Sequence, residues 1–564
     1  MFDKAYKGLI KFRQKTLVQD RIYILALSTA VLLLLGVTMY GAYNSSDFFS
    51  NGSDALADTY LFTNPHLHSI VLPEQHPNIL KFPIFYIQGL FPYHYTSFTL
   101  VNILIVLITV AAWSLLLIRL FGARRTYTLL ILILFSLLIL CSPTLDINLT
   151  ELSIRNIEFP IALWFIFTIN RLLRGMPASR KQWAWTSLCC LLYCLTLAGD
   201  NYFEYAISLP LILVIIWYWV QSKKFSRNMF KILVLIALMS IVAAFIKLIV
   251  VKTGIILLYK PVTPSTIVNY NLIGPSFTVA FQQLLTLEGA NIFGQAIGSA
   301  TLYELLDFGL LITSIIGLSL VFCSISKSYR KHARLIHGND FIYMTIAVSF
   351  FMVFSVYIFS GQVVQMLSNG QVASLGQGRY IAFMPLLGLI GIMWLIKTYS
   401  QKRTSLVVLL IVGSIMGMAT SIPTIRSSFV DTIASTKPSR TVLAQTINDL
   451  HQDQVSEVLT GYNYGPPLTF WSDNTISTAS ILNCNQPFLF NVRKDSYSPH
   501  NHTRTALVID RPDAVWWNCS NRMIMNIYGV PSKEQIVPDE TAGPYTEIWV
   551  YNYDVRQKLL PFIQ

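Results

Sequence analysis

Long apolar stretches recur along the whole chain, and they constrain its fold more than any other feature. A helix that crosses a bilayer needs about 20 mainly apolar residues. Only 12% of the 564 residues are charged, roughly half the share found in soluble domains. We therefore predict an all-α, multi-spanning membrane protein with eleven transmembrane helices, at residues 22–43, 98–118, 127–142, 157–170, 184–199, 205–220, 232–251, 306–326, 341–360, 381–396 and 405–423.

The distribution of Lys and Arg predicts the orientation of these helices. Loops on the side of the N-terminus carry twenty-four Lys and Arg residues, whereas the opposite loops before residue 424 carry five. Because basic residues favour the cytoplasmic side, we expect the N-terminus inside and, after eleven spans, the C-terminal tail outside. The first apolar stretch is too long for a cleaved signal peptide, so we expect a retained anchor. The net charge of +13 lies in these short clusters and does not indicate nucleic-acid binding.

The composition changes near residue 424, which predicts two domains. Residues 1–423 form the membrane domain, and residues 424–564 form a soluble, extracytoplasmic α/β domain. Within the tail, RTVLAQTINDLHQD has helical spacing, whereas SEVLTGY, TALVID and TEIWVYNY are typical of strands. The tail holds Cys484 and Cys519, and a disulfide between them is allowed if the tail lies outside. The sequence leaves that pairing open.

The predicted outer face is more elaborate than the inner face, which indicates that function lies outside. Its largest parts are a first outer loop at 44–97 and a long outer loop at 252–305. The aromatic segment ILKFPIFYIQGLFPYHYTSF in the first loop is broken by two prolines, so we expect interfacial helices. Residues 277–305 are either similar or re-entrant.

The first outer loop carries two carboxylates, Asp54 and Asp58, four residues apart in GSDALADTYLF. On a helix both lie on one face. Close carboxylates can share a proton or hold a divalent cation such as Mg²⁺ or Mn²⁺, and either one can act as a general base for an acceptor hydroxyl. The alternative is an N-cap at Ser53 or Asp54 with a solvated Asp58.

Three further ionisable residues lie at the outer ends of predicted spans. Glu158 opens a span in IRNIEFP, and ionisable groups at membrane depth are often functional. The alternative is an ion pair between Arg155 and Glu158 at the helix start. Asp200 in AGDNYFEY is either a capping residue or a catalytic or ligand-binding residue.

Basic residues at the outer face are candidates for binding phosphate. Arg379 precedes Tyr380 in GQGRYIAFMP, where a guanidinium can bind a phosphate through paired hydrogen bonds. Lys260 is a weaker candidate of the same kind. The alternative for both is snorkelling to lipid headgroups. The four histidines of the first loop have no diagnostic metal spacing.

Together these segments resemble the type-C glycosyltransferases (GT-C), which are multi-spanning enzymes that use polyprenyl-phosphate-linked sugars. The resemblance looks closest to bacterial members. It is carried by six short segments: GSDALADTYLF, ILKFPIFYIQGLF, IRNIEFP, AGDNYFEYAISLP, GQGRYIAFMP and, in the tail, GYNYGPPLTFW.

The resemblance implies an inverting glycosyl transfer at the outer face of a bacterial cytoplasmic membrane. Asp58 or Asp54 would deprotonate or orient the hydroxyl of a glycan, lipid or protein acceptor. Arg379 would stabilise the charge that develops on the departing polyprenyl phosphate. Interfacial helices would admit the lipid tail, and aromatic residues of the outer loops would stack on sugar rings.

Three other functions remain open at this point. A transporter or flippase of lipid-linked sugars would need polar residues deep within its spans and usually repeat symmetry. A polymerase or ligase of lipid-linked glycans would tend to carry its large loop late in the chain. A non-catalytic scaffold or sensor would act through its tail. The clustering of polar residues at outer helix ends favours an enzyme over a transporter.

Overall fold

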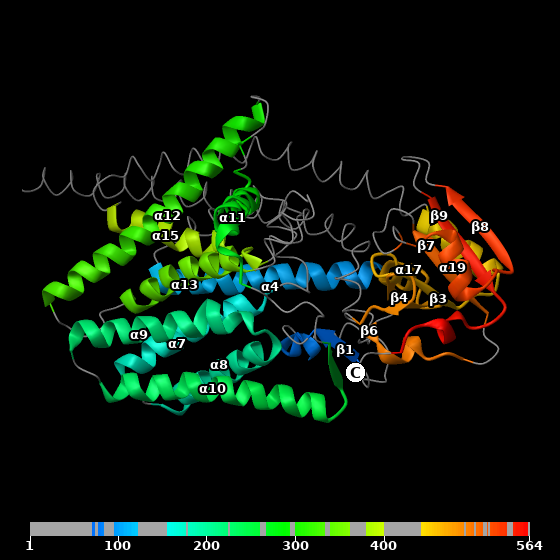
Figure 1. The fold of residues 1–564 in the computed structure, drawn as a ribbon. Coiled ribbons are helices and arrows are strands. Elements are labelled where there is room, and N and C mark those ends of the chain that lie inside the picture. The colour runs from blue at the N-terminus through cyan, green and yellow to red at the C-terminus, as the bar shows by residue number, and fades with distance from the viewer. Residues whose placement is uncertain are drawn as a thin grey trace, which may run out of the picture.

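A computed structural model shows a bundle of long helices with a mixed α/β domain at one end (Figure 1). It describes residues 70–73, 77–83, 95–121, 155–175, 177, 179–223, 226–259, 267–290, 292–293, 299–332, 339–360, 380–399, 442–489, 492–500, 504–510, 516, 519–538 and 545–561.

The bundle is built from helices that coincide with predicted spans. They are α4 (Tyr95–Phe121), α7 (Glu158–Arg174), α8 (Arg180–Gly199), α9 (Leu209–Ser222), α10 (Arg227–Lys252), α12 (Ser299–His332), α13 (Asp340–Phe359) and α15 (Met384–Tyr399). A π-helical turn, η2 (Glu204–Ser208), leads into α9, and α11 (Ile273–Leu287) precedes α12. Within the described part, four helices are long and apolar enough to cross a membrane: Glu204–Ser222, Arg227–Lys252, Asp307–Lys327 and Asp340–Phe359.

These findings support a multi-spanning membrane protein. Apolar side chains on α10 face outward, with Ile241 66% exposed and Phe245 61% exposed, as expected of a surface that lipid covers. The predicted spans at 22–43, 127–142 and 405–423 lie outside the described residues. The total of eleven spans and the domain boundary at 423–424 therefore stay predictions.

Small residues allow α12 and α15 to pack closely. A Cβ atom on Gly317 would lie 2.6 Å from the backbone of Gly391, and one on Gly388 would lie 2.9 Å from the Ser314 side chain. Close backbone approach at small residues is a common way for helices to associate in a bilayer, where van der Waals packing replaces the hydrophobic effect.

The tail domain holds a six-stranded mixed sheet in the order β5-β4-β3-β7-β9-β8. Its strands are β3 (Glu457–Gly461), β4 (Ser477–Leu482), β5 (Gln486–Pro487), β7 (Thr505–Asp510), β8 (Lys533–Pro538) and β9 (Tyr545–Tyr551). Both faces are covered: Ala506 and Val508 of β7 pack on one side, while Leu507 and Ile509 pack on the other. Helices at 442–452, α17 (Gly465–Trp471) and α19 (Asn521–Tyr528) accompany the sheet. The predicted α/β character is confirmed.

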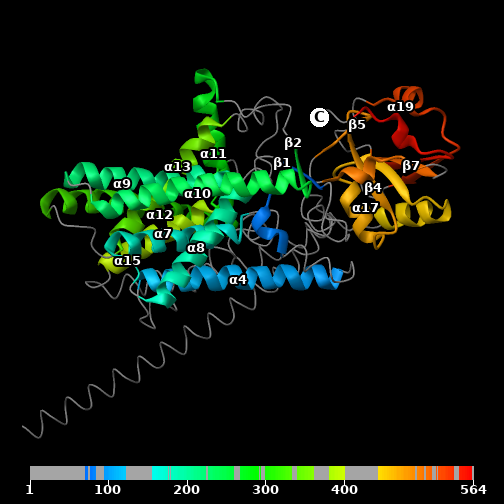
Figure 2. The same cartoon turned by 90° about the horizontal axis from the view of Figure 1, so that it is seen from below.

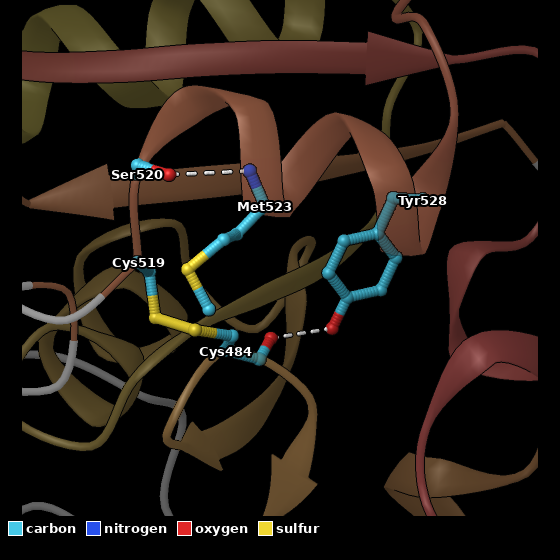
Figure 3. The surroundings of a disulfide bond; sticks show 5 residues. All are labelled: Cys484, Cys519, Ser520, Met523 and Tyr528. Carbon is cyan, nitrogen blue, oxygen red and sulfur yellow. Dashed lines mark hydrogen bonds between the residues drawn. A yellow bond between two sulfur atoms is a disulfide. The ribbon is translucent and has the colours of Figure 1, made fainter.

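A disulfide joins Cys484 to Cys519, with their Cα atoms 5.7 Å apart. Figure 3 shows that it holds the start of α19 against the turn after β4. The Tyr528 hydroxyl donates a 2.7 Å hydrogen bond to the carbonyl of Cys484, and Ser520 caps α19 by accepting from the Met523 N–H. Both ends of α19 are thus fixed to neighbouring structure.

A second, three-stranded sheet joins the tail to the bundle. In it β1 (Ile70–Pro73), from the first outer loop, runs parallel to β2 (Ile256–Tyr259), which follows α10. The other edge of β1 pairs with β6 (Val492–Arg493) of the tail. Segments predicted in the first loop, the long loop and the tail therefore meet at one end of the bundle. Figure 2 shows β1 beside β2 there.

We predict that peptide mapping without reductant, on membranes prepared with an alkylating agent, recovers Cys484 linked to Cys519 and Cys323 alkylated. Replacing both tail cysteines with serine should destabilise the tail by about 2–4 kcal/mol, because the disulfide no longer restricts the unfolded chain. A Cys323→Ser variant is the control. Recovery of Cys484 in alkylated form would contradict the prediction.

Candidate functional site

Four buried charged side chains lie where α7 and α8 meet the short 3-10 turn η1 (Ile79–Lys81). We call Lys81, Arg155, Glu158 and Asp200 the charge cluster. Their exposed fractions are 0%, 8%, 3% and 5%, in that order. Charged side chains are almost never buried to this degree unless they are paired, so their partners decide whether the arrangement is stable.

The first pair joins Lys81 to Glu158 at 3.2 Å between Nζ and Oε1. The second carboxylate oxygen of Glu158, Oε2, is buried and has no hydrogen-bond partner among the residues that the structure describes. A desolvated acceptor of this kind costs about 1–3 kcal/mol or more when it carries charge. Glu158 Oε2 therefore offers a ready acceptor to a hydroxyl group that enters the cluster.

The second pair joins Arg155 to Asp200. Arg155 Nε donates to Asp200 Oδ2 at 2.6 Å, and Nη2 donates to Oδ1 at 3.4 Å. The guanidinium lies over the ring of Tyr202, 4.2 Å from its centroid, and 5.4 Å from that of Tyr380. Burial is the largest single influence and by itself would lower the pKa of Arg155, but the charge of Asp200, the neighbouring Tyr205 and Tyr202, and the hydrogen bond to Asp200 together raise this pKa. Arg155 is therefore a permanent cation, and neither ion-pair bond uses its Nη1.

A close backbone contact positions Lys81 beside α7. The Asn78 N–H donates to the carbonyl of Gly199, the last residue of α8, at 3.0 Å. A Cβ atom on Gly199 would lie 3.0 Å from the Ile79 nitrogen, so the lack of a side chain there lets η1 approach. Asp200 then ends α8 and accepts a 2.9 Å hydrogen bond from the Tyr202 N–H.

The structure brings together four residues that the sequence singled out: Arg155, Glu158, Asp200 and Tyr380. The interpretation of Arg155 and Glu158 as partners is wrong, since each pairs with a residue distant in sequence. The capping interpretation of Asp200 is confirmed, but the same carboxylate also holds Arg155. The other predicted site residues lie outside the described residues: Asp54, Asp58, Lys260 and Arg379.

Sequence reasoning missed Lys81, which it treated as an ordinary charge of the outer loop. A signal was present, because Lys81 is the single charged residue in the apolar, aromatic run ILKFPIFY. A lone cation in such a run is expected to be buried and paired. Which carboxylate it pairs with depends on the approach of η1 to α8, which no local pattern reveals.

The charge cluster combines two cations with two carboxylates, so its formal charge is balanced. Such a site can bind a ligand that carries both an anionic group and hydroxyl groups, because cations and acceptors lie side by side. Among the described residues, no group of His, Cys, Asp or Glu could hold a metal ion. The predicted Mg²⁺ or Mn²⁺ site at Asp54 and Asp58 lies outside them.

A separate buried carboxylate follows α11. Glu288 is 4% exposed, and burial, with the nearby charge of Asp307 adding to it, raises the pKa of Glu288 to about 8. Glu288 is therefore largely protonated at neutral pH.

Comparison with known proteins gives one structural match to report. No family model matches the chain, and no curated protein matches it. The crystal structure of ArnT from Cupriavidus metallidurans in the apo state is similar over 96% of this chain and 99% of that chain, with 12% identity and a TM-score of 0.39. A TM-score of this size assigns no residue of this chain a role.

We predict that Lys81→Met lowers the stability of the purified protein by about 3–5 kcal/mol, because Glu158 is left buried and charged without its partner. The double variant Lys81→Met, Glu158→Met should recover most of the loss. The unfolding temperature in detergent reports both changes, with Lys558→Met in the tail as the control. A double variant no more stable than Lys81→Met would contradict the ion pair.

Proposed function

We propose that this chain is a membrane glycosyltransferase that moves a sugar from a polyprenyl-phosphate-linked donor to an extracytoplasmic glycan, lipid or protein acceptor. The charge cluster is the observation that carries the proposal. Paired cations and carboxylates, buried among spanning helices at the tail end of the bundle, suit a ligand that combines phosphate with sugar hydroxyls. Buried charge at such depth destabilises a fold, and a functional requirement explains its retention.

The proposed orientation has the cluster and the tail outside the cytoplasm. The Cys484–Cys519 disulfide supports it, because disulfides form and persist in oxidising compartments. The meeting of β1, β2 and β6 supports it as well, since the three segments come from parts that the Lys and Arg distribution assigns to one side. A bacterial cytoplasmic membrane with the N-terminus inside fits both.

In the proposed reaction, Asp58 or Asp54 accepts the proton of the acceptor hydroxyl. The freed oxygen attacks C1 of the donor sugar from the face opposite the phosphate, and the bond between C1 and the phosphate oxygen breaks. The configuration at C1 inverts, and polyprenyl phosphate leaves with the bonding electrons. Positive groups aimed at the phosphate stabilise the charge that develops there.

The described residues supply the donor-binding part of this scheme. Arg155 is held by Asp200 and covered by Tyr202, so its guanidinium is oriented before a ligand arrives. Glu158 Oε2 is suited to accept a hydrogen bond from a sugar hydroxyl. The ring of Tyr380 contacts the Arg155 guanidinium, and we propose Arg379, which precedes Tyr380 in the sequence, as a second cation for the phosphate.

We predict that Asp58→Asn abolishes transfer while leaving donor binding intact, because the amide keeps the shape but cannot accept the proton. The measurement is release of free polyprenyl phosphate from a panel of polyprenyl-phosphate hexoses and pentoses. Asp54→Asn is the matched variant four residues away. If one of the two variants retains activity, the aspartate replaced in it is not the general base.

Full activity of both asparagine variants would contradict a first-loop base. If the protein moved lipid-linked sugar across the membrane of a vesicle without transferring the sugar, the chain would be a flippase and not a glycosyltransferase. Protein yield and the Cys484–Cys519 linkage serve as folding controls for every variant.

A further inference from the structure

Strand β1 belongs to two hydrophobic cores at once. Its side chains alternate, with Ile70 and Leu72 packed into the bundle and Val71 packed into the tail. Strand β2 alternates in the same way, since Ile256 packs with the bundle and Leu257 with the tail. Period-two alternation thus makes this small sheet a shared wall, with one face toward each domain.

The tail strand β6 continues this wall and sets the direction of Arg493. In the antiparallel pair, Val492 lies opposite Val71 and Arg493 lies opposite Ile70. Directly opposed residues share a face. Val492 therefore faces the tail core, in which it is buried, and Arg493 faces the side of the bundle.

Arg493 is buried, yet one of its nitrogen atoms has no partner among the described residues. The residue is 3% exposed, whereas the side chain of Asp495 is 55% exposed. Arg493 Nε donates to Asp495 Oδ1 at 3.0 Å, and Nη2 donates to Oδ2. Nη1 is fully buried and makes no hydrogen bond within the described part of the chain. The two bonds to Asp495 fix the plane of the guanidinium, so Nη1 is a rigid donor.

We propose that Arg493 binds the phosphate group of a lipid at the wall between the tail and the bundle. A buried donor without a partner is destabilising, and such a group calls for an ordered water or an ion. Phosphate oxygen is the acceptor that best matches a planar guanidinium. We assign this phosphate to a lipid because Arg493 faces the bundle, whose helices are long and apolar enough to span a membrane.

This inference deepens the proposed function, because it makes the tail part of the donor site. The phosphate can come from polyprenyl phosphate or from an ordinary phospholipid headgroup, and both present the same acceptor. A tail that contributes a phosphate contact explains why β6 is fixed to β1 by a shared core. The tail is then a wall of the site and not an independent binding module.

The test is the dissociation constant of short-chain polyprenyl phosphate, measured by calorimetry on the full-length protein in detergent. Arg493→Gln should weaken binding by about 10- to 100-fold, the loss expected for a charge-assisted hydrogen bond of about 1.5–3 kcal/mol. Arg522→Gln, at an exposed position on α19, is the matched control and should bind as the wild type does.

Asp495→Asn provides a second variant, for which we expect the opposite effect on the affinity for polyprenyl phosphate. It keeps the guanidinium but removes the competing negative charge, so the affinity for phosphate should rise several-fold. A residue with a purely structural role would show weaker binding or none in both variants. The Cys484–Cys519 linkage and the unfolding temperature without ligand show whether each variant is folded.

A folded Arg493→Gln protein that binds polyprenyl phosphate within twofold of the wild type would overturn the proposal and leave a buried water as the partner of Nη1. The same titration with phosphatidylglycerol distinguishes the sources. Arg493-dependent binding of that lipid alone assigns the site to a bilayer headgroup. Arg493-dependent binding of polyprenyl phosphate by a protein without transfer activity supports this inference and contradicts the proposed function.

Discussion

The burial of charge at the tail end of the bundle is the constraint on which the rest of this account depends. Lys81 and Arg155 are removed from water, and each requires a carboxylate to compensate. Those carboxylates come from different elements. The pair Lys81–Glu158 connects η1 to α7, and the pair Arg155–Asp200 connects the residues just before α7 to the end of α8. The glycine at 199 permits that approach. An arrangement this costly is expected where binding or catalysis needs charge in a dry environment.

A second consequence concerns the tail. Because β1 leads within a few residues to Lys81, the small β1-β2-β6 sheet links the tail to the charge cluster through one short stretch of chain. Val71 in the tail core and Ile70 in the bundle core hold that stretch from both sides. Displacing the tail would therefore disturb Lys81. The structure favours a tail that completes the site over one that acts at a distance.

The sequence predicted elements well where one pattern decides the outcome. Apolar length located α10 and α13, and the apolar runs of TALVID and TEIWVYNY located β7 and β9. It also singled out Arg155, Glu158 and Asp200, all three of which form buried ion pairs in the charge cluster. It did not predict their partners, because the pairing depends on how η1 packs against Gly199. Lys81 and Arg493 were missed for the same reason: burial of a cation is a tertiary property.

The measurement that tests the central claim most directly is the unfolding temperature of the wild-type protein with polyprenyl phosphate and, in parallel, with the uncharged polyprenol of equal chain length. A site built on buried cations should be stabilised by the phosphate and not by the alcohol. An equal shift with both lipids, or no shift with either, would contradict a phosphate-binding role for the charge cluster.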